Sequence, residues 1–243
     1  MAVYQDKARE RIKSGYGKIR SACKRGKNHN IGEADTRAIV EQTLVELLGY
    51  DLHEDITREQ MCKGGICDFQ LMHEGKPYAI IEVKRLPSNI KEHHAWQARD
   101  YAVNEGIEWV LVTNGAEWQA YHLFFFKKKG CNPQPDLLPL FTVSFLDTEM
   151  KLQERVDLLY LLSKEAIRHR ELDAYRDKLQ ALSPQELTKR LMREDVMDRI
   201  RIGIKNDIGF RIDNDELAER ISEIIKDEAI PPNLGYLIKK LGK

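Results

Sequence analysis

Two carboxylates and a lysine in the first half of the chain are spaced for metal-dependent chemistry. Asp68 lies in a short apolar run, a Gly-Lys-Pro turn follows, and a second apolar run carries Glu82, Val83 and Lys84. If both runs are strands, Glu82 and Lys84 point to one face, because side chains alternate along a strand. Buried charges need partners, and Asp68 on the neighbouring strand is the obvious one. Such a group suits Mg²⁺ and a phosphodiester, since Mg²⁺ prefers oxygen ligands.

The arrangement therefore predicts hydrolysis of a phosphodiester bond. Mg²⁺, or Mn²⁺ in its place, would be held by Asp68, Glu82 and a nearby backbone carbonyl such as that of Val83. The metal would polarise the scissile phosphate and lower the pKa of an attacking water. Lys84 would stabilise the charge that develops on the phosphate or orient the water. We expect Asp68, Glu82 and Lys84 to be the catalytic residues.

Further motifs carry a resemblance to known nucleases. The Asp, the spacer and the Glu-x-Lys resemble the PD-(D/E)xK nuclease superfamily, although Cys67 stands where that motif usually has proline. Gln97 and Tyr101 resemble the QxxxY motif of RecB-like nucleases. Glu33 and Arg37, at the start of a predicted helix, resemble the beginning of the nuclease domain at the N-terminus of type I restriction enzyme R subunits.

This resemblance covers about residues 33–123 and implies a restriction-endonuclease-like α/β core, with a central mixed β-sheet flanked by helices. It implies a metal-dependent endonuclease acting on double-stranded DNA. In the superfamily the helix before the hairpin adds a carboxylate to the metal, so Glu33 is a candidate catalytic residue and metal ligand, with Glu41 as the alternative. The alternative is a structural role, in which Glu33 caps the helix and pairs with Arg37 one turn later. By the same resemblance, Gln97 and Tyr101 bind DNA near the metal.

The order of the predicted elements agrees with this core without depending on it. Residue patterns predict helices over 5–26, 33–48 and 90–105, and strands around 60–62, 67–71, 78–84, 108–113 and 118–123. A helix, three strands, a helix and two strands form an α/β order with a mixed sheet. The lysines at 127–129 and the proline-containing stretch after them predict a solvated loop and linker.

The chain after residue 149 is predicted to be helical. Its pattern predicts helices over 149–181, from 183 to about 202, and from 213 or 214 to about 228. We therefore divide the chain into a basic N-terminal helical arm (1–32), a nuclease core (33–146) and a helical C-terminal region (147–243). The last region has no catalytic motif. Packing on the core, a homodimer contact and binding of another partner stay open as its roles, and the length of its first helix favours the homodimer.

The charge of the chain is balanced, with 39 basic and 39 acidic residues. This balance argues against a protein that binds nucleic acid through bulk charge alone. Basic residues are nevertheless concentrated between residues 7 and 27. We predict that Lys24, Arg25 and Lys27 contact nucleic-acid phosphates, the alternative being a solvated helix without a partner.

The cysteines and the hydropathy indicate a cytoplasmic protein. Four cysteines without paired spacing predict free thiols in a reducing compartment. A zinc site that uses Cys62 and Cys67 with His53 or His73 is disfavoured, because no Cys-x-x-Cys or paired histidine spacing is present. No apolar run reaches the roughly 20 residues that span a bilayer, and the N-terminus lacks an apolar signal region, so no membrane partner is expected.

The sequence also limits the activities that the chain could carry out without a partner. No Gly-x-x-x-x-Gly-Lys-Ser/Thr motif occurs, so ATP-driven translocation would need a helicase partner, and recognition of a site would need a specificity partner. Two alternatives to a nuclease stay open. One is a noncatalytic nucleic-acid-binding or assembly protein that retains the nuclease fold. The other is an interaction domain in which Asp68, Glu82 and Lys84 form a structural ion-pair cluster, and such a cluster would not take up Mg²⁺.

Overall fold

A computed structural model describes residues 3–62, 65–126 and 132–225, with the backbone alone for residues 60–62, 65 and 66. The chain divides into two compact units, residues 1–174 and 175–243. The boundary falls within helix α6 (Glu171–Ala181). The predicted C-terminal region, 147–243, is therefore shared between the two units.

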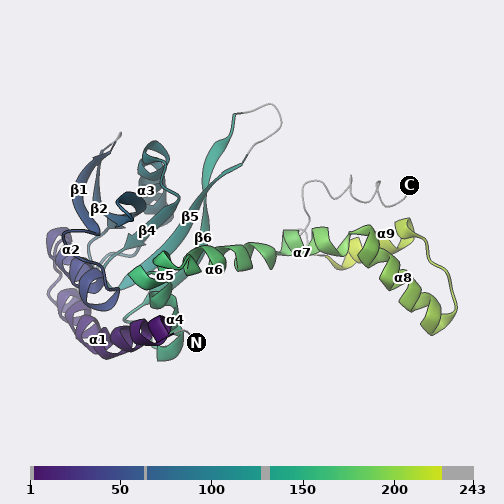
Figure 1. Ribbon diagram of the computed structural model, residues 1–243, viewed down its shortest axis with the longest axis horizontal. Coiled ribbons are helices and arrows are strands. Elements are labelled where there is room, and N and C mark those ends of the chain that lie inside the picture. Colours follow the sequence, from purple (N-terminus) through teal and green to yellow (C-terminus); the bar gives the residue numbers. More distant parts are fainter. Residues whose placement is uncertain (1–2, 63–64, 127–131, 226–243) are drawn as a thin grey trace. The chain divides into compact units, whose positions relative to one another are not determined.

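A six-stranded mixed sheet forms the centre of the first unit (Figure 1). The strands lie side by side in chain order, and neighbours are antiparallel except for β3 and β4, which are parallel because a helix connects them. This confirms the predicted α/β fold with a mixed sheet. The strands are β1 (Ile56–Cys62), β2 (Gly65–His73), β3 (Lys76–Val83), β4 (Trp109–Thr113), β5 (Glu117–Phe126) and β6 (Gln134–Ser144).

Strand β6 was not expected from the sequence. The prediction of a linker up to residue 135 is wrong at its end, since β6 begins at Gln134 and pairs with β5 along its length. Pro135 and Pro139 hide the strand pattern, because proline lacks the N–H of a ladder. They are tolerated because β6 is an edge strand of the sheet. The predicted loop around the lysines at 127–129 lies outside the described residues.

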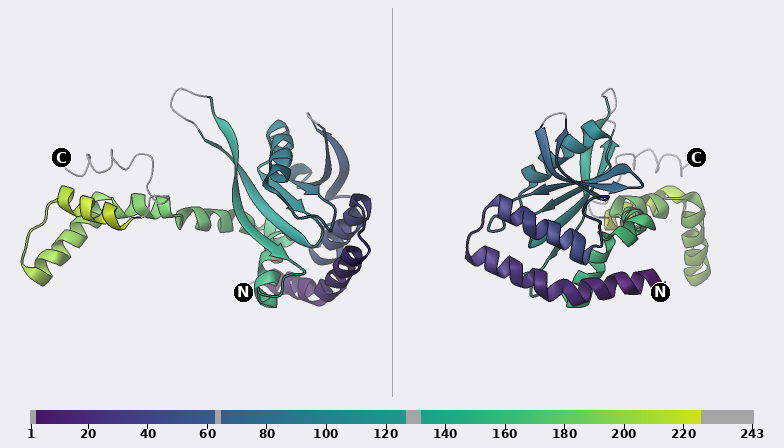
Figure 2. Two further views of the ribbon diagram at one scale, coloured as in Figure 1. Left: turned by 180° about the vertical axis from the view of Figure 1, so that it is seen from behind. Right: turned by 60° about the vertical axis from the view of Figure 1, so that its left-hand side comes forward.

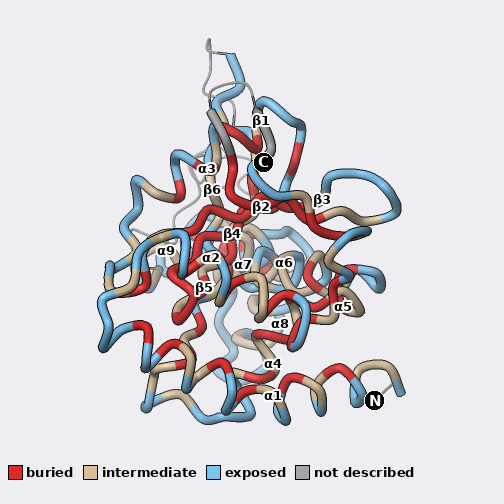
Figure 3. The backbone as a smooth tube through the Cα atoms, turned by 90° about the vertical axis from the view of Figure 1, so that its left-hand side faces the viewer, coloured by how far each residue is buried: buried red, intermediate tan, exposed pale blue. Residues whose placement is uncertain are grey.

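Helices cover both faces of this sheet (Figure 2). Helix α3 (Glu92–Glu105) packs through small side chains on Ile80, Val110 and Val112. Helix α2 (Glu33–Gln42) lies on the other face and continues as a π-helical turn, η1 (Thr43–Leu47). The predicted helix end at Gly49 is confirmed by its left-handed φ of 78°. Buried residues are concentrated along β2, β3 and β4 (Figure 3).

The N-terminal helix α1 (Val3–Asn28) is part of the first unit. Its buried residues recur every three or four positions and pack toward η1 and α4. Many of its basic residues are used inside the unit. Arg9 pairs with Asp157 at 2.7 Å, and Arg11 donates two hydrogen bonds to Glu165 at 2.6 and 2.7 Å. The predicted basic arm is therefore a helix that packs within the unit, and its exposed basic residues include Lys7 and Lys13 as well as Lys24, Arg25 and Lys27 near its end.

The helical region after the sheet is more divided than predicted. The expected helix over 149–181 is three helices, α4 (Leu152–Leu161), α5 (Lys164–Arg168) and α6. Ser163 caps α5 by accepting a hydrogen bond from the Ala166 N–H, and Arg170 takes a φ of 56° before α6. The apolar pattern does not change at these breaks, so it could not predict them.

The second unit contains α7 (Pro184–Leu191), α8 (Glu194–Ile208) and α9 (Asn214–Ile224). The predicted helix start at 183 is confirmed, but the helix does not run to 202, because α7 ends at Leu191 and α8 begins at Glu194. Asp213 caps α9, since its side chain accepts a hydrogen bond from the Glu216 N–H at 2.8 Å. Helix α9 ends at Ile224, before the expected end near 228. A small core joins these helices through Met192, Met197, Leu217 and Ala218.

Two sequence expectations concern thiols and membranes. Cys23 and Cys67 are buried free thiols, and burial raises the pKa of Cys23 to about 12. The side chains of Cys62 and Cys131 lie outside the described part of the chain. Of the helices that the structure describes, none is long and apolar enough to cross a membrane.

Candidate active site

The candidate site lies where strand β2 separates from strand β3. The pairing of these strands ends at Phe69 and Ile81, and Asp68 and Glu82 are the next residues in the same register. Strand β3 stays paired with β4 there, since Glu82 lies opposite Val112, while β2 stays paired with β1. The two carboxylates therefore lie in a fork between strands, where side chains take the place of ladder hydrogen bonds.

Asp68 is held by two donors from different elements. It is buried, with 8% of its surface exposed. Its Oδ2 accepts a hydrogen bond from the Val83 N–H at 2.7 Å, and its Oδ1 accepts one from Arg37 of α2 at 2.8 Å. The first bond replaces a ladder bond across the fork. The second is an ion pair that compensates the buried charge.

Glu82 is more deeply buried and less completely paired, with 3% of its surface exposed. Its Oε1 accepts a hydrogen bond from Lys84 Nζ at 2.6 Å, and its Oε2 is buried without a hydrogen-bond partner among the described residues. Burial raises the pKa of Glu82 although Lys84 opposes this, and the negative charges of Asp68 and Glu33 add to the increase. An orphaned buried carboxylate oxygen is costly and is the feature that a cation would satisfy.

Helix α2 brings one further carboxylate to the fork. Glu33 is its first residue, close enough for its charge to affect the pKa of Glu82. Glu41, the alternative from the sequence, is instead paired with Arg58 of β1. The alternative in which Glu33 pairs with Arg37 is wrong, because Arg37 is bonded to Asp68. Of the two α2 carboxylates, Glu33 is the one whose charge acts on Glu82, whereas Glu41 is engaged by Arg58.

Helix α3 adds the two residues of the QxxxY motif. Lys84 Nζ donates to Gln97 Oε1 at 3.4 Å, and Gln97 Nε2 donates to the Tyr101 hydroxyl at 3.3 Å. Gln97 is exposed, whereas Tyr101 is 7% exposed and belongs to the core beneath α3. Gln97 and Tyr101 therefore lie on one face of α3. His93, one turn before Gln97, contacts the ring of His94.

A divalent metal fits the donors of this fork. Asp68 and Glu82 converge there with one orphaned carboxylate oxygen, and Glu33 lies nearby. In the part of the chain that the structure describes, no three carboxylate, histidine or cysteine side chains form a complete metal-binding group. Mg²⁺ does not require such a group, since it is usually bound through one or two carboxylates and retains several waters.

The comparison with protein families agrees with this geometry. Residues 32–133 match the family described as type I restriction enzyme R protein N terminus. This part of the chain is similar to that family. No curated protein and no solved structure matches the chain. The matched residues contain the whole fork between β2 and β3, together with α2 and α3.

Three exposed basic residues lie just before the part of the chain that matches this family. Lys24, Arg25 and Lys27 are in the last turns of α1, and the matched residues begin at 32. The loop after α1 contacts the residue that follows Lys84, since Arg85 donates to the Asn30 side chain at 3.2 Å. The loop after α1 therefore lies near the end of β3.

Sequence reasoning missed two residues that contact the site. Arg37 was considered only as a partner for Glu33, and Glu59 was not considered. Arg37 Nη1 lies 2.8 Å from Asp68 and 3.7 Å from Glu59 of β1. The contact with Glu59 could not be predicted, because Glu59 departs from regular strand geometry with a φ of 46°.

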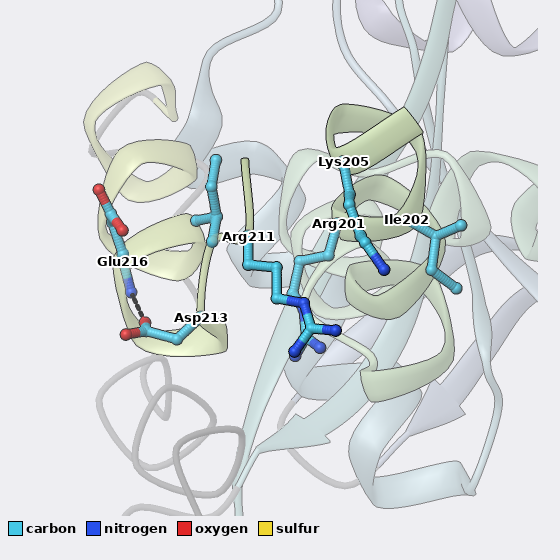
Figure 4. Close-up of a pocket in the computed structure, with 7 residues that line it drawn as sticks. Arg201, Ile202, Lys205, Arg211, Asp213 and Glu216 are labelled. Atoms are coloured by element: carbon cyan, nitrogen blue, oxygen red, sulfur yellow. Dashed lines mark hydrogen bonds between the residues drawn. The ribbon is translucent and has the colours of Figure 1, made fainter. Parts of the chain in front are cut away.

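The second unit has a cavity of its own, and none of its lining residues is a predicted site residue. It has a volume of 510 Å³ and lies between α8 and α9 (Figure 4). Arg201, Lys205 and Arg211 line it together with the carboxylates of Asp213 and Glu216. These opposite charges lie on α8, on α9 and on the segment between them, outside the residues that match the family.

Proposed function

We propose that this chain is a metal-dependent nuclease that hydrolyses phosphodiester bonds in DNA. The observation that carries the proposal is the Glu82 Oε2 atom, buried without a partner in the fork next to Asp68 and Lys84. A fold that needed only an ion pair would gain by satisfying or exposing that oxygen. The match to a restriction-enzyme domain supports DNA as the substrate.

Each residue of the fork then has a definite task. Asp68, Glu82 and the Val83 carbonyl would hold Mg²⁺ or Mn²⁺, with Glu33 contributing from α2. The bound metal would supply Lewis acidity to the scissile phosphate and a water of lowered pKa. Lys84 is fixed by Glu82 and Gln97, so its ammonium is positioned to donate to the non-bridging oxygens of the phosphate as negative charge develops.

DNA would reach the fork along two surfaces. Gln97 is exposed and bonded to both Lys84 and Tyr101, so its amide can position a phosphate beside the lysine. Lys24, Arg25 and Lys27 are exposed at the end of α1 and would neutralise phosphates farther along the duplex. These contacts carry no base specificity, and we propose that a specificity or helicase partner supplies it.

The predicted homodimer through the C-terminal helices stays a proposal. It is supported by the large apolar side chains that α7, α8 and the loop before α9 expose, namely Leu187, Leu191, Ile202, Ile208 and Phe210. Such side chains on a small unit are typical of an interaction surface.

One observation favours the alternative of an interaction domain in which Asp68, Glu82 and Lys84 form a structural ion-pair cluster. The Asp68 charge is already compensated by Arg37, as in a structural ion pair. Metal binding separates this alternative from a nuclease, because a structural cluster has no use for a divalent cation.

The decisive experiment is cleavage of supercoiled and linear DNA with Mg²⁺ or Mn²⁺. Wild type is compared with Glu82→Gln and Lys84→Met, and the control is Glu105→Gln, which changes an exposed carboxylate at the end of α3. We expect a loss of at least about 100-fold in both site variants, the scale of removing one charge-stabilising group, and none in the control. EDTA should abolish the activity.

Circular dichroism must first show that the variants are folded. Nicking of supercoiled DNA would identify internal cleavage. Unchanged cleavage by Glu82→Gln would refute the assignment of the site. Retained DNA binding without cleavage or metal uptake would favour the noncatalytic alternative.

A further inference from the structure

Three carboxylates lie in one row across neighbouring strands. The β1–β2 ladder pairs Arg58 with Phe69 and Gln60 with Cys67, and Glu59 and Asp68 stand level with each other between these pairs. Glu59 has a left-handed φ of 46°, so its side chain does not follow the alternation of a regular strand, and its contact with Arg37 gives its position instead. The β2–β3 register continues from Phe69 and Ile81 to Asp68 and Glu82. The row therefore runs from Glu59 on β1 through Asp68 on β2 to Glu82 on β3.

One guanidinium lies between the first two members of this row. Arg37 Nη1 is 2.8 Å from Asp68 Oδ1 and 3.7 Å from Glu59 Oε1. The Asp68 side chain is 11% exposed and the Glu59 side chain is 67% exposed. Arg37 thus holds the buried carboxylate closely and has a second, solvated carboxylate within reach of the same nitrogen.

This position conflicts with metal binding at Asp68. A divalent cation on Asp68 and Glu82 would be repelled by a guanidinium hydrogen-bonded to one of its ligands. The repulsion between the cation and the guanidinium decreases if Arg37 breaks its hydrogen bond to Asp68 and pairs with Glu59 instead. Lys84 contacts the other carboxylate of the site, at Glu82 Oε1, but its second neighbour is the neutral amide of Gln97, so no second carboxylate receives it.

We propose that Arg37 and Glu59 form a latch that sets the affinity of the site for divalent metal. Arg37 holds Asp68 when no metal is bound and moves to Glu59 when metal binds. Arg37 and Glu59 are thus positioning residues that act through Asp68. The proposal rests on the proposed function, because it assumes that Asp68 and Glu82 hold the metal.

The latch predicts opposite effects for its two members. Arg37→Met removes the competitor, so Mn²⁺ should bind more tightly. Glu59→Gln removes the carboxylate to which Arg37 would move, so Arg37 stays paired with Asp68 and Mn²⁺ should bind more weakly. Each change should be about fivefold, the effect expected for one partly exposed ion pair. The double variant should behave as Arg37→Met alone, because Glu59 acts only through Arg37.

Mn²⁺ binding to the full chain without DNA is measured at pH 8 from the electron paramagnetic resonance signal of the free ion. Arg37→Lys, which keeps the positive charge, should bind Mn²⁺ less tightly than Arg37→Met. Thermal melts establish that every variant is folded. A merely structural Arg37 would not give effects of opposite sign at positions 37 and 59.

Two outcomes overturn the latch. One is equal or weaker Mn²⁺ affinity in Arg37→Met, and the other is tighter binding in Glu59→Gln. Glu82→Gln separates this failure from failure of the proposed function. If Glu82→Gln leaves Mn²⁺ binding unchanged, the metal is not in the fork and both proposals fall. If it abolishes binding while Arg37→Met has no effect, only the latch falls.

Discussion

Replacement of Glu82 by glutamine should stabilise the first unit when no metal is present. Glu82 Oε2 is buried without a partner, and the carboxylate is repelled by Asp68 and Glu33. An unsatisfied buried group costs about 1–3 kcal/mol. The ion pair with Lys84, which the substitution weakens, opposes this effect, because both side chains are largely buried. Burial and the repulsion outweigh that pair in raising the pKa of Glu82, so we expect a net gain of about 1 kcal/mol in the free energy of unfolding.

The pH dependence of this gain follows from the raised pKa of Glu82. A carboxyl whose folded-state pKa is raised destabilises the fold at every pH above that value. The destabilisation declines as the pH falls through the folded-state pKa and is absent below the unfolded-state pKa. Protonated Glu82 resembles glutamine, so wild type and variant should have the same stability near pH 4. Their difference should be fully present at pH 8.

Urea unfolding followed by tryptophan fluorescence provides the assay. All three tryptophans, Trp96, Trp109 and Trp118, belong to the first unit. With EDTA at pH 8, the variant midpoint should exceed that of wild type by about 0.5 M if the slope is about 2 kcal/mol per molar urea. Mg²⁺ at ten times its Kd should add about 1.4 kcal/mol to wild type alone. A variant less stable than wild type in EDTA would refute this account of the orphaned oxygen.

Two further predictions concern α1. Replacing Lys24, Arg25 and Lys27 by glutamine should weaken DNA binding and reduce the slope of log affinity against log salt by up to about 2.7, as expected for three lost phosphate contacts. Binding titrations from 50 to 200 mM salt measure this, and an unchanged slope would assign the residues to a solvated surface. Arg11→Met should lower the free energy of unfolding by about 1–2 kcal/mol, because Arg11 bonds both oxygens of half-buried Glu165. Unfolding in urea would contradict the ion pair if Arg11→Met matched wild type.

The sequence predicted the site best where the alternation of side chains along a single strand decides their positions. Glu82 and Lys84 were expected on one face because side chains alternate, and the ammonium does reach the carboxylate, at 2.6 Å. The pattern also located β3 and α3, whose apolar positions are regular. Asp68 could be placed near them because two strands joined by a short turn must pair.

The sequence was least informative where a long-range contact decides the outcome. Arg37 was expected to pair with Glu33 because the two are one helical turn apart, yet it reaches Asp68, which lies 31 positions away. Likewise, the basic pattern of α1 suggested a DNA-binding arm. Its carboxylate partners Asp157 and Glu165 lie on helices far along the chain, and no local rule connects them to Arg9 and Arg11.

The charges around the fork bear directly on how metal and DNA would bind together. Asp68 and Glu82 are balanced by Arg37 and Lys84, which leaves the inner site neutral. Glu33 and Glu59 add two negative charges at its edge, the charge that one divalent cation neutralises. A metal that entered would therefore leave no excess negative charge to repel a phosphodiester. Because the inner pairs already satisfy most of each carboxylate, we expect metal affinity to be modest without DNA and to increase when a phosphate oxygen becomes a further ligand.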